Sequence, residues 1–122
     1  MATFQVPEAF LYAQDAGEDL SSALYKIAAV ASDGDIELCG DGAAALGVII
    51  EGNTENNPVT VQFGGIAKVL AGGAITAGSK VASDANGLLV TAAADDHAIG
   101  LALSAGDTSD IVPVALNGGL GV

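Results

Sequence analysis

Short apolar segments alternate with glycine- and aspartate-rich turns along the whole chain. In Val59–Phe63, two valines and a phenylalanine alternate with Thr60 and Gln62, which is the period of a strand with one buried face. Many short strands at such spacing predict an all-β fold, a single compact β-sandwich or barrel-like domain. The predicted strands are 26–30, 47–50, 59–63, 66–70, 80–83, 88–91, 99–103 and 111–116.

Three segments fit this pattern less simply. The alanine-rich stretch Gly42–Leu46 and the stretch Glu8–Gln14, which follows Pro7, could each form a short helical turn. Pro113 has no N–H to donate, so we expect the strand 111–116 to lie at a sheet edge or to contain a bulge.

The two halves of the chain resemble each other. Gly47–Ile50 matches Gly100–Leu103, and Val59–Gly65 matches the segment that begins at Val112, both at an offset of 53 positions. The segment that begins at Lys26 matches the one at Lys80 at nearly the same offset. We therefore expect an internal pseudo-repeat within one β domain, because two copies are too few for a solenoid.

Several glycines stand where tight turns are needed. Gly72, Gly73 and Gly78 allow turns with a positive φ angle, and Asn86–Gly87 is typical of a type I′ hairpin turn. We expect Gly73, Gly78 and Gly87 to be required for folding.

The composition limits the size of the core and the choice of partners. Of 122 residues, 24 are alanine and 36 are larger aliphatic or aromatic residues, so one thin-cored domain is expected, and association with another surface would stabilise it. The net charge is −12 with three lysines and no arginine, which argues against nucleic acid and anionic membranes as partners. The sequence shows neither a membrane span nor a signal peptide, so we expect synthesis in the cytoplasm.

The residue types that usually carry catalysis are nearly absent. The chain has a single histidine, His97, beside Asp95 and Asp96, and a single cysteine, Cys39. We interpret His97 as part of a solvated turn and Cys39 as a buried apolar residue. The sequence therefore predicts no enzymatic activity, no catalytic residues, no metal site and no cofactor.

The order of motifs over residues 45–116 resembles the tailed-phage capsid cement, or head decoration, protein family. The pieces are ALGVIIEG from Ala45, VTVQFGGIAKVLAG from Val59, AGGAITAGSKVASDANG from Ala71, AIGLAL from Ala98, and IVPVAL from Ile111. This resemblance implies a structural protein of the virion, made in the host cytoplasm. It would bind the outer capsid surface and bridge major capsid protein subunits, stabilising the shell as a homo-oligomer, with a trimer favoured over a dimer.

The first residues match the family less well and are rich in aromatic side chains. Phe4, Phe10, Tyr12 and Tyr25 are four of the five aromatic residues, and such side chains often anchor interfaces. We therefore predict a capsid-binding N-terminal arm over residues 1–22, containing a possible short helix, before a β domain over residues 23–122. Two alternatives remain open: the aromatics could cap the β core, and the protein could be an acidic adhesin or glycan-binding appendage of the virion.

Overall fold

Over the described residues, the chain folds into ten short strands and no helix. The computed structural model describes residues 11–116 and confirms the all-β prediction. The strands are β1 (Leu11–Asp15), β2 (Ile27–Val30), β3 (Ile36–Leu38), β4 (Gly47–Glu51), β5 (Pro58–Gln62), β6 (Ile66–Leu70), β7 (Lys80–Ser83), β8 (Leu89–Thr91), β9 (Gly100–Ala102) and β10 (Ile111–Leu116).

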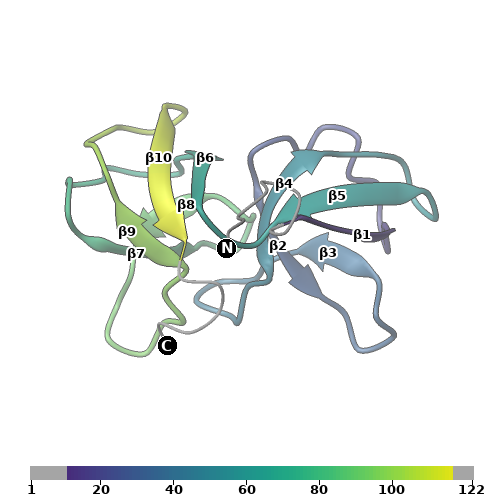
Figure 1. Ribbon diagram of the computed structural model, residues 1–122. Helices are drawn as coiled ribbons and strands as arrows, with labels where there is room; N and C mark the ends of the chain where they lie inside the picture. Colours follow the sequence, from purple (N-terminus) through teal and green to yellow (C-terminus); the bar gives the residue numbers. More distant parts are fainter. Residues whose placement is uncertain (1–10, 117–122) are drawn as a thin grey trace, which may run out of the picture.

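The strands form two five-stranded antiparallel sheets that lie side by side (Figure 1). The order is β1-β5-β4-β2-β3 in the first sheet and β6-β10-β9-β7-β8 in the second, so adding five to each label converts one into the other. The expected pseudo-repeat is thereby confirmed, and each copy contains five strands. We call residues 11–62 the first lobe and residues 66–116 the second lobe.

The pairing registers define which positions of the two lobes are equivalent. Ala28 lies opposite Gly47 in the first lobe, and Val81 lies opposite Gly100 in the second, an offset of 53 positions. The same offset relates the other strands except the first of each lobe. Leu11 and Ile66, which begin those first strands, are 55 positions apart.

Each sheet curls until its two outer strands approach each other. The curl is completed by parallel bridges from Ala16 to Ile36 and from Ala71 to Leu89, which make each lobe barrel-like. Each lobe therefore has a core of its own. The first is built on residues such as Ile36, Val59 and Val61, and most of the second lobe's buried residues belong to a separate cluster.

The outer face of the first lobe is buried against the second lobe. Ile27, Cys39 and Val48 belong to the hydrophobic cluster of the second lobe, and both Ile27 and Val48 are fully buried. The Ile27 N–H donates to the Gly87 carbonyl at 2.7 Å, and the Leu70 N–H donates to the Tyr25 carbonyl at 2.9 Å. The two lobes are thus joined by both apolar packing and backbone hydrogen bonds.

Two strands are absent from the predicted set, and the helical turns do not form. The first expected helical turn is partly replaced by strand β1, which contains Leu11–Gln14 and shows no alternation of burial. The second expected turn, Gly42–Leu46, is a non-helical connection. The missed strand Ile36–Leu38 is too short to show a period. Glu8–Phe10 lie outside the described residues. Because β1 pairs with β5, residues 11–15 of the expected arm belong to the first sheet.

The expectation that Pro113 lies at a sheet edge is wrong. Strand β10 runs between β6 and β9, with Pro113 opposite Lys68. The Pro113 carbonyl accepts a hydrogen bond from the N–H of Leu103, which directly follows the end of β9. In an antiparallel sheet, the N–H and C=O of one residue point toward the same neighbouring strand. The N–H that Pro113 lacks would therefore point toward Leu103, where the pairing of β10 with β9 has ended.

The glycine turns differ in part from the prediction. Gly78 and Gly87 have positive φ angles of 84° and 75°, whereas Gly72 and Gly73 do not adopt this conformation. The expected type I′ turn is wrong, because it requires a positive φ at both central residues and Asn86 has none. Instead, the Asp84 carboxylate accepts hydrogen bonds from the N–H groups of Asn86 and Leu88, which shapes this turn.

We predict that Gly100→Ala destabilises the fold and that Gly73→Ala does not. A Cβ at Gly100 would collide with the Ala115 carbonyl oxygen on the neighbouring strand β10, whereas a Cβ at Gly73 would meet only Val90 Cγ1 at 3.8 Å. Overpacking of this kind costs about 1–3 kcal/mol. Thermal unfolding followed by circular dichroism should therefore show a lower melting temperature for Gly100→Ala only. Equal melting temperatures would contradict the proposed close approach of the strands.

Candidate functional site

An apolar groove opens at one end of the first lobe. It is lined by Tyr12, Val30, Leu46 and Phe63 and has a volume of about 300 Å³. Tyr12 lies opposite the buried Val61, and Val30 lies opposite the buried Ile36, so these side chains face the same side of the sheet as the core. They nevertheless remain 42% and 51% exposed. Within residues 11–116, the groove is therefore the place where the first lobe's apolar interior reaches the surface.

The structure separates the predicted aromatic residues of the arm. Phe4 and Phe10 lie outside the described residues, and Tyr12 lines the groove. Tyr25 precedes β2, whereas Val30 ends that strand, so Tyr25 and the groove lie toward opposite ends of β2. Tyr25 has a positive φ of 68°, and its backbone N–H donates to the Ile49 carbonyl at 2.8 Å. The described aromatic residues that meet are thus Tyr12 and Phe63.

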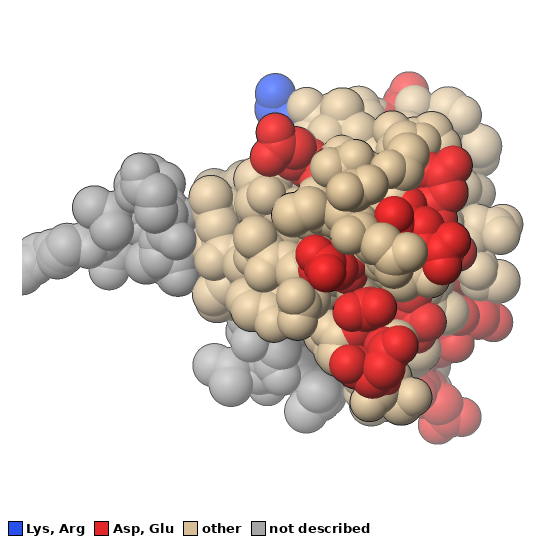
Figure 2. Space-filling model, turned by 90° about the vertical axis from the view of Figure 1, so that its right-hand side faces the viewer, with Lys and Arg blue, Asp and Glu red and all other residues tan. Residues whose placement is uncertain are grey.

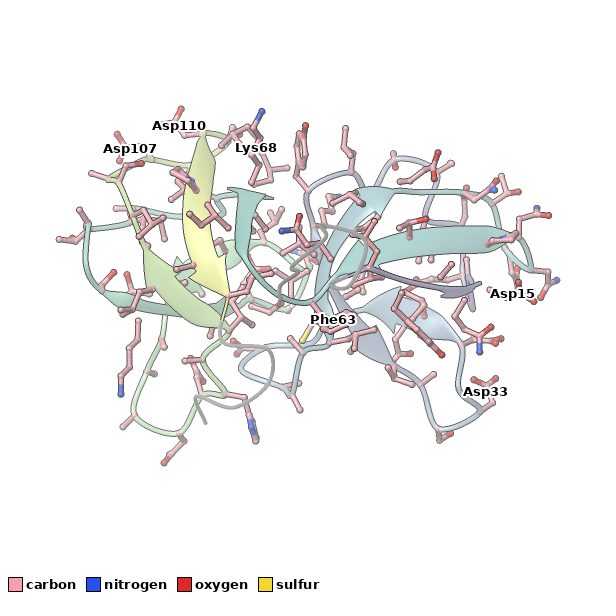
Figure 3. The ribbon with its side chains drawn as sticks, in the orientation of Figure 1. Asp15, Asp33, Phe63, Lys68, Asp107 and Asp110 are labelled. Carbon is pink, nitrogen blue, oxygen red and sulfur yellow. The ribbon has the colours of Figure 1, made fainter. Side chains whose placement is uncertain are left out.

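Many acidic side chains lie at the end of the molecule formed by the first lobe. Figure 2 views this end and shows Asp and Glu side chains distributed over much of it. Asp15 and Asp33 lie at this end in Figure 3. The first lobe contains nine acidic residues and one lysine, while the second lobe contains five acidic residues and two lysines. The negative charge of the chain is therefore concentrated on one lobe.

Asp96 and His97, two of the few residues with side chains suited to chemistry, form hydrogen bonds with the backbone of the fold. The Asp96 carboxylate accepts a hydrogen bond from the Ala93 N–H at 2.8 Å, and the His97 N–H donates to the Gly42 carbonyl at 3.0 Å. Over residues 11–116, no group of three His, Cys, Asp or Glu side chains could hold a metal ion. No helix in this part of the chain is long and apolar enough to cross a membrane.

Cys39 is buried at the contact between the lobes. Its Sγ lies 3.5 Å from the Ala43 carbonyl oxygen, to which the thiol donates, and the Ser83 hydroxyl donates to the Cys39 carbonyl at 3.4 Å. Burial raises the pKa of the Cys39 thiol, and the neighbouring Ser83 side chain opposes this effect only in part. The thiol therefore stays protonated and shielded at pH values where an exposed cysteine reacts.

We predict that iodoacetamide at pH 8 alkylates native Cys39 much more slowly than the urea-unfolded chain. The reason is that the thiolate is the reactive form and both burial and the raised pKa suppress it. The double variant Cys39→Ala, Ser32→Cys, which carries its thiol at an exposed turn, should react quickly in both states. Rapid modification of the native wild-type chain would show that Cys39 is accessible.

Comparisons with known proteins identify relatives among phage structural proteins. A family model described as phage cement protein matches residues 15–116. The crystal structure of the head fiber gp8.5 N base in bacteriophage phi29 is similar, with a TM-score of 0.73 and 15% sequence identity, over 89% of this chain and 94% of that chain. No curated protein matches the sequence. The structural likeness, at this identity, shows a shared fold.

Proposed function

The chain belongs to the phage cement protein family, and from this premise we propose that it binds the outer surface of an icosahedral phage head and bridges major capsid protein subunits. The observation that carries the proposal is the family match, which spans nearly all the described residues. The chain is a phage structural protein, and the bridging role is the step that we add. We further propose that it acts as a homo-oligomer, a trimer rather than a dimer.

The physical character of the molecule supports a binding role. Four of the exposed large apolar side chains project from the second lobe, and the first lobe adds the groove. Apolar surface that water would otherwise cover is available for burial against another protein. The net charge of −12 keeps such a protein away from the DNA that a phage head packages. The exposed apolar residues of the second lobe are Ile66, Leu101, Leu103 and Ile111.

The N-terminal segment remains our candidate for one capsid contact. Strand β1, from Leu11 to Asp15, pairs with β5 along its whole described length, so deleting residues 2–10 leaves every described pair of the first sheet in the chain. Phe4 and Phe10 lie in this segment, and buried aromatic side chains are frequent anchors of protein interfaces. We propose that these two residues, rather than Tyr25, attach the protein to the shell.

We predict that saturating protein raises the temperature at which capsids release DNA. A ligand that binds the assembled shell and not the free subunits stabilises the shell by about 2.7 kcal/mol per site at a hundredfold excess over Kd. The measurement compares dye-detected DNA release from shells without the protein, before and after its addition. Equal release temperatures at confirmed saturation would contradict a cementing role. Electron microscopy of the same shells would show whole-shell decoration, whereas staining confined to the tail or to sparse spikes would favour an adhesin.

We predict that deleting residues 2–10 abolishes tight binding to undecorated capsids while preserving the fold. Co-sedimentation measures the binding, and circular dichroism with thermal melting measures the fold. The matched control is the double substitution Phe4→Leu, Phe10→Leu, which keeps the segment length and should weaken binding less than the deletion. A folded deletion variant that still saturates capsids would show that the lobes make the main contact. A deletion variant that unfolds would show that the aromatic residues belong to the core.

A further inference from the structure

The groove of the first lobe has a counterpart in the second lobe, where it is covered. By the pairing registers, Tyr12, Val30, Leu46 and Phe63 correspond to Ala67, Ser83, Ile99 and Leu116. The equivalence extends to hydrogen bonds, because the Leu46 N–H donates to the Ala28 carbonyl and the Ile99 N–H donates to the equivalent Val81 carbonyl. In the second lobe the first three of these residues are buried, and Leu116 packs against the core.

The first lobe supplies the cover for this end of the second lobe. Ile27, Cys39 and Val48, on the outer face of the first lobe, share one hydrophobic cluster with Ala67 and Ile99. The turn at Gly87 also reaches this face, because its carbonyl accepts the hydrogen bond from the Ile27 N–H. The contact is therefore head-to-tail: the end of one lobe packs on the outer face of the other.

The second lobe presents the equivalent outer face to solvent. Val48 corresponds to Leu101, and Ile27 corresponds to Lys80, by the register of β9 with β7. Leu101 is 46% exposed, and Lys80 is exposed as well. Ile66, Ala115 and Leu101 form one row across β6, β10 and β9, which extends this face as an apolar surface. Within residues 11–116, each end of the molecule thus presents a surface equivalent to one half of the inter-lobe contact.

We propose that the groove of one copy binds the outer face of the second lobe of another copy, around Leu101, and so repeats the contact between the lobes. The inference deepens the proposed homo-oligomer, on which it rests, by assigning both of its surfaces. Leu101 of one molecule packs in the groove formed by Tyr12 and Phe63 of the next. A head-to-tail contact of this kind closes into a ring when its rotation permits, which accommodates a trimer of six lobes.

The charges at the two surfaces are complementary in this arrangement. Within the chain, the turn containing Gly87 faces the apolar Ile27. The turn equivalent to it contains Gly34, which also has a positive φ and is flanked by Asp33 and Asp35. In the contact between copies, these carboxylates face Lys80, which replaces Ile27. In the contact between copies, a glycine flanked by two aspartates therefore meets a lysine, whereas within the chain Gly87, flanked by Asn86 and Leu88, meets isoleucine.

The test uses two variants, each of which removes one half of the contact. Tyr12→Glu places a charge in the groove, and Leu101→Glu places a charge on the outer face. Sedimentation velocity should show an oligomer for the wild type and a monomer for each variant alone. Mixing the two variants should give a dimer and nothing larger, because only one intact contact can form. Leu24→Glu, at an exposed position of the first lobe outside the groove, should leave the oligomer unchanged.

A charge exchange tests the acidic turn separately. Lys80→Glu should weaken self-association by about tenfold or more, and adding Asp33→Lys and Asp35→Lys to that variant should restore it. Failure of the exchange to restore association would overturn the assignment of these charges.

Three results would overturn the proposed contact. These are a wild-type chain that stays monomeric at all soluble concentrations, an oligomer that survives both glutamate substitutions, and folded variants that fail to form the mixed dimer. A groove filled by residues 1–10 of the same chain would give the first result for the wild type and an oligomer once those residues are deleted. Co-sedimentation of the monomeric variants with capsids measures capsid binding separately, so the proposed function can fail or hold independently.

Discussion

The contact on which the architecture depends is the closure of the second lobe by the outer face of the first. Ile27 takes part in it twice, because its side chain belongs to the second lobe's cluster and its N–H donates to the Gly87 carbonyl. Two of the four residues at this end of the second lobe, Ala67 and Ser83, are small, and Ile27 and Val48 of the first lobe pack in the same cluster. The first lobe thus supplies apolar area that the second lobe's own sequence does not encode. An alanine-rich chain can build a stable core in this way, because the sheet of the first lobe contributes residues to both hydrophobic clusters.

The alternation of polar and apolar residues predicted most strands and the repeat, because both are encoded locally. Val59, Val61 and Phe63 mark one face of a strand, and Gly47 and Gly100 mark the same position in each copy. Strands β1 and β3 escaped prediction, since β1 shows no alternation of burial and β3 has only three residues. Their places are decided by partners distant in sequence, which a local pattern does not contain.

The groove was predictable only in part, for a related reason. Tyr12 was recognised as an aromatic residue near the terminus, but its neighbour Phe63 follows β5 and meets it through pairing between β1 and β5. The signal that could have identified the site is divergence between the repeats. Where the first copy has Tyr12 and Val30, the second has the small residues Ala67 and Ser83. Large residues in one copy and small ones in the other indicate an end that is open in the first and packed in the second.

The connection between the lobes determines how strong their contact must be. Only Phe63, Gly64 and Gly65 separate β5 from β6, so each lobe experiences the other at an effective concentration in the millimolar range or above, as short linkers provide. A contact too weak to hold two separate molecules therefore remains formed within the chain. When the same contact forms between two molecules, no linker raises the local concentration. The contact itself must then bind tightly enough to hold the molecules together. Lys80 and Leu101, which stand in the positions of Ile27 and Val48, provide a charge and a larger apolar side chain for that purpose.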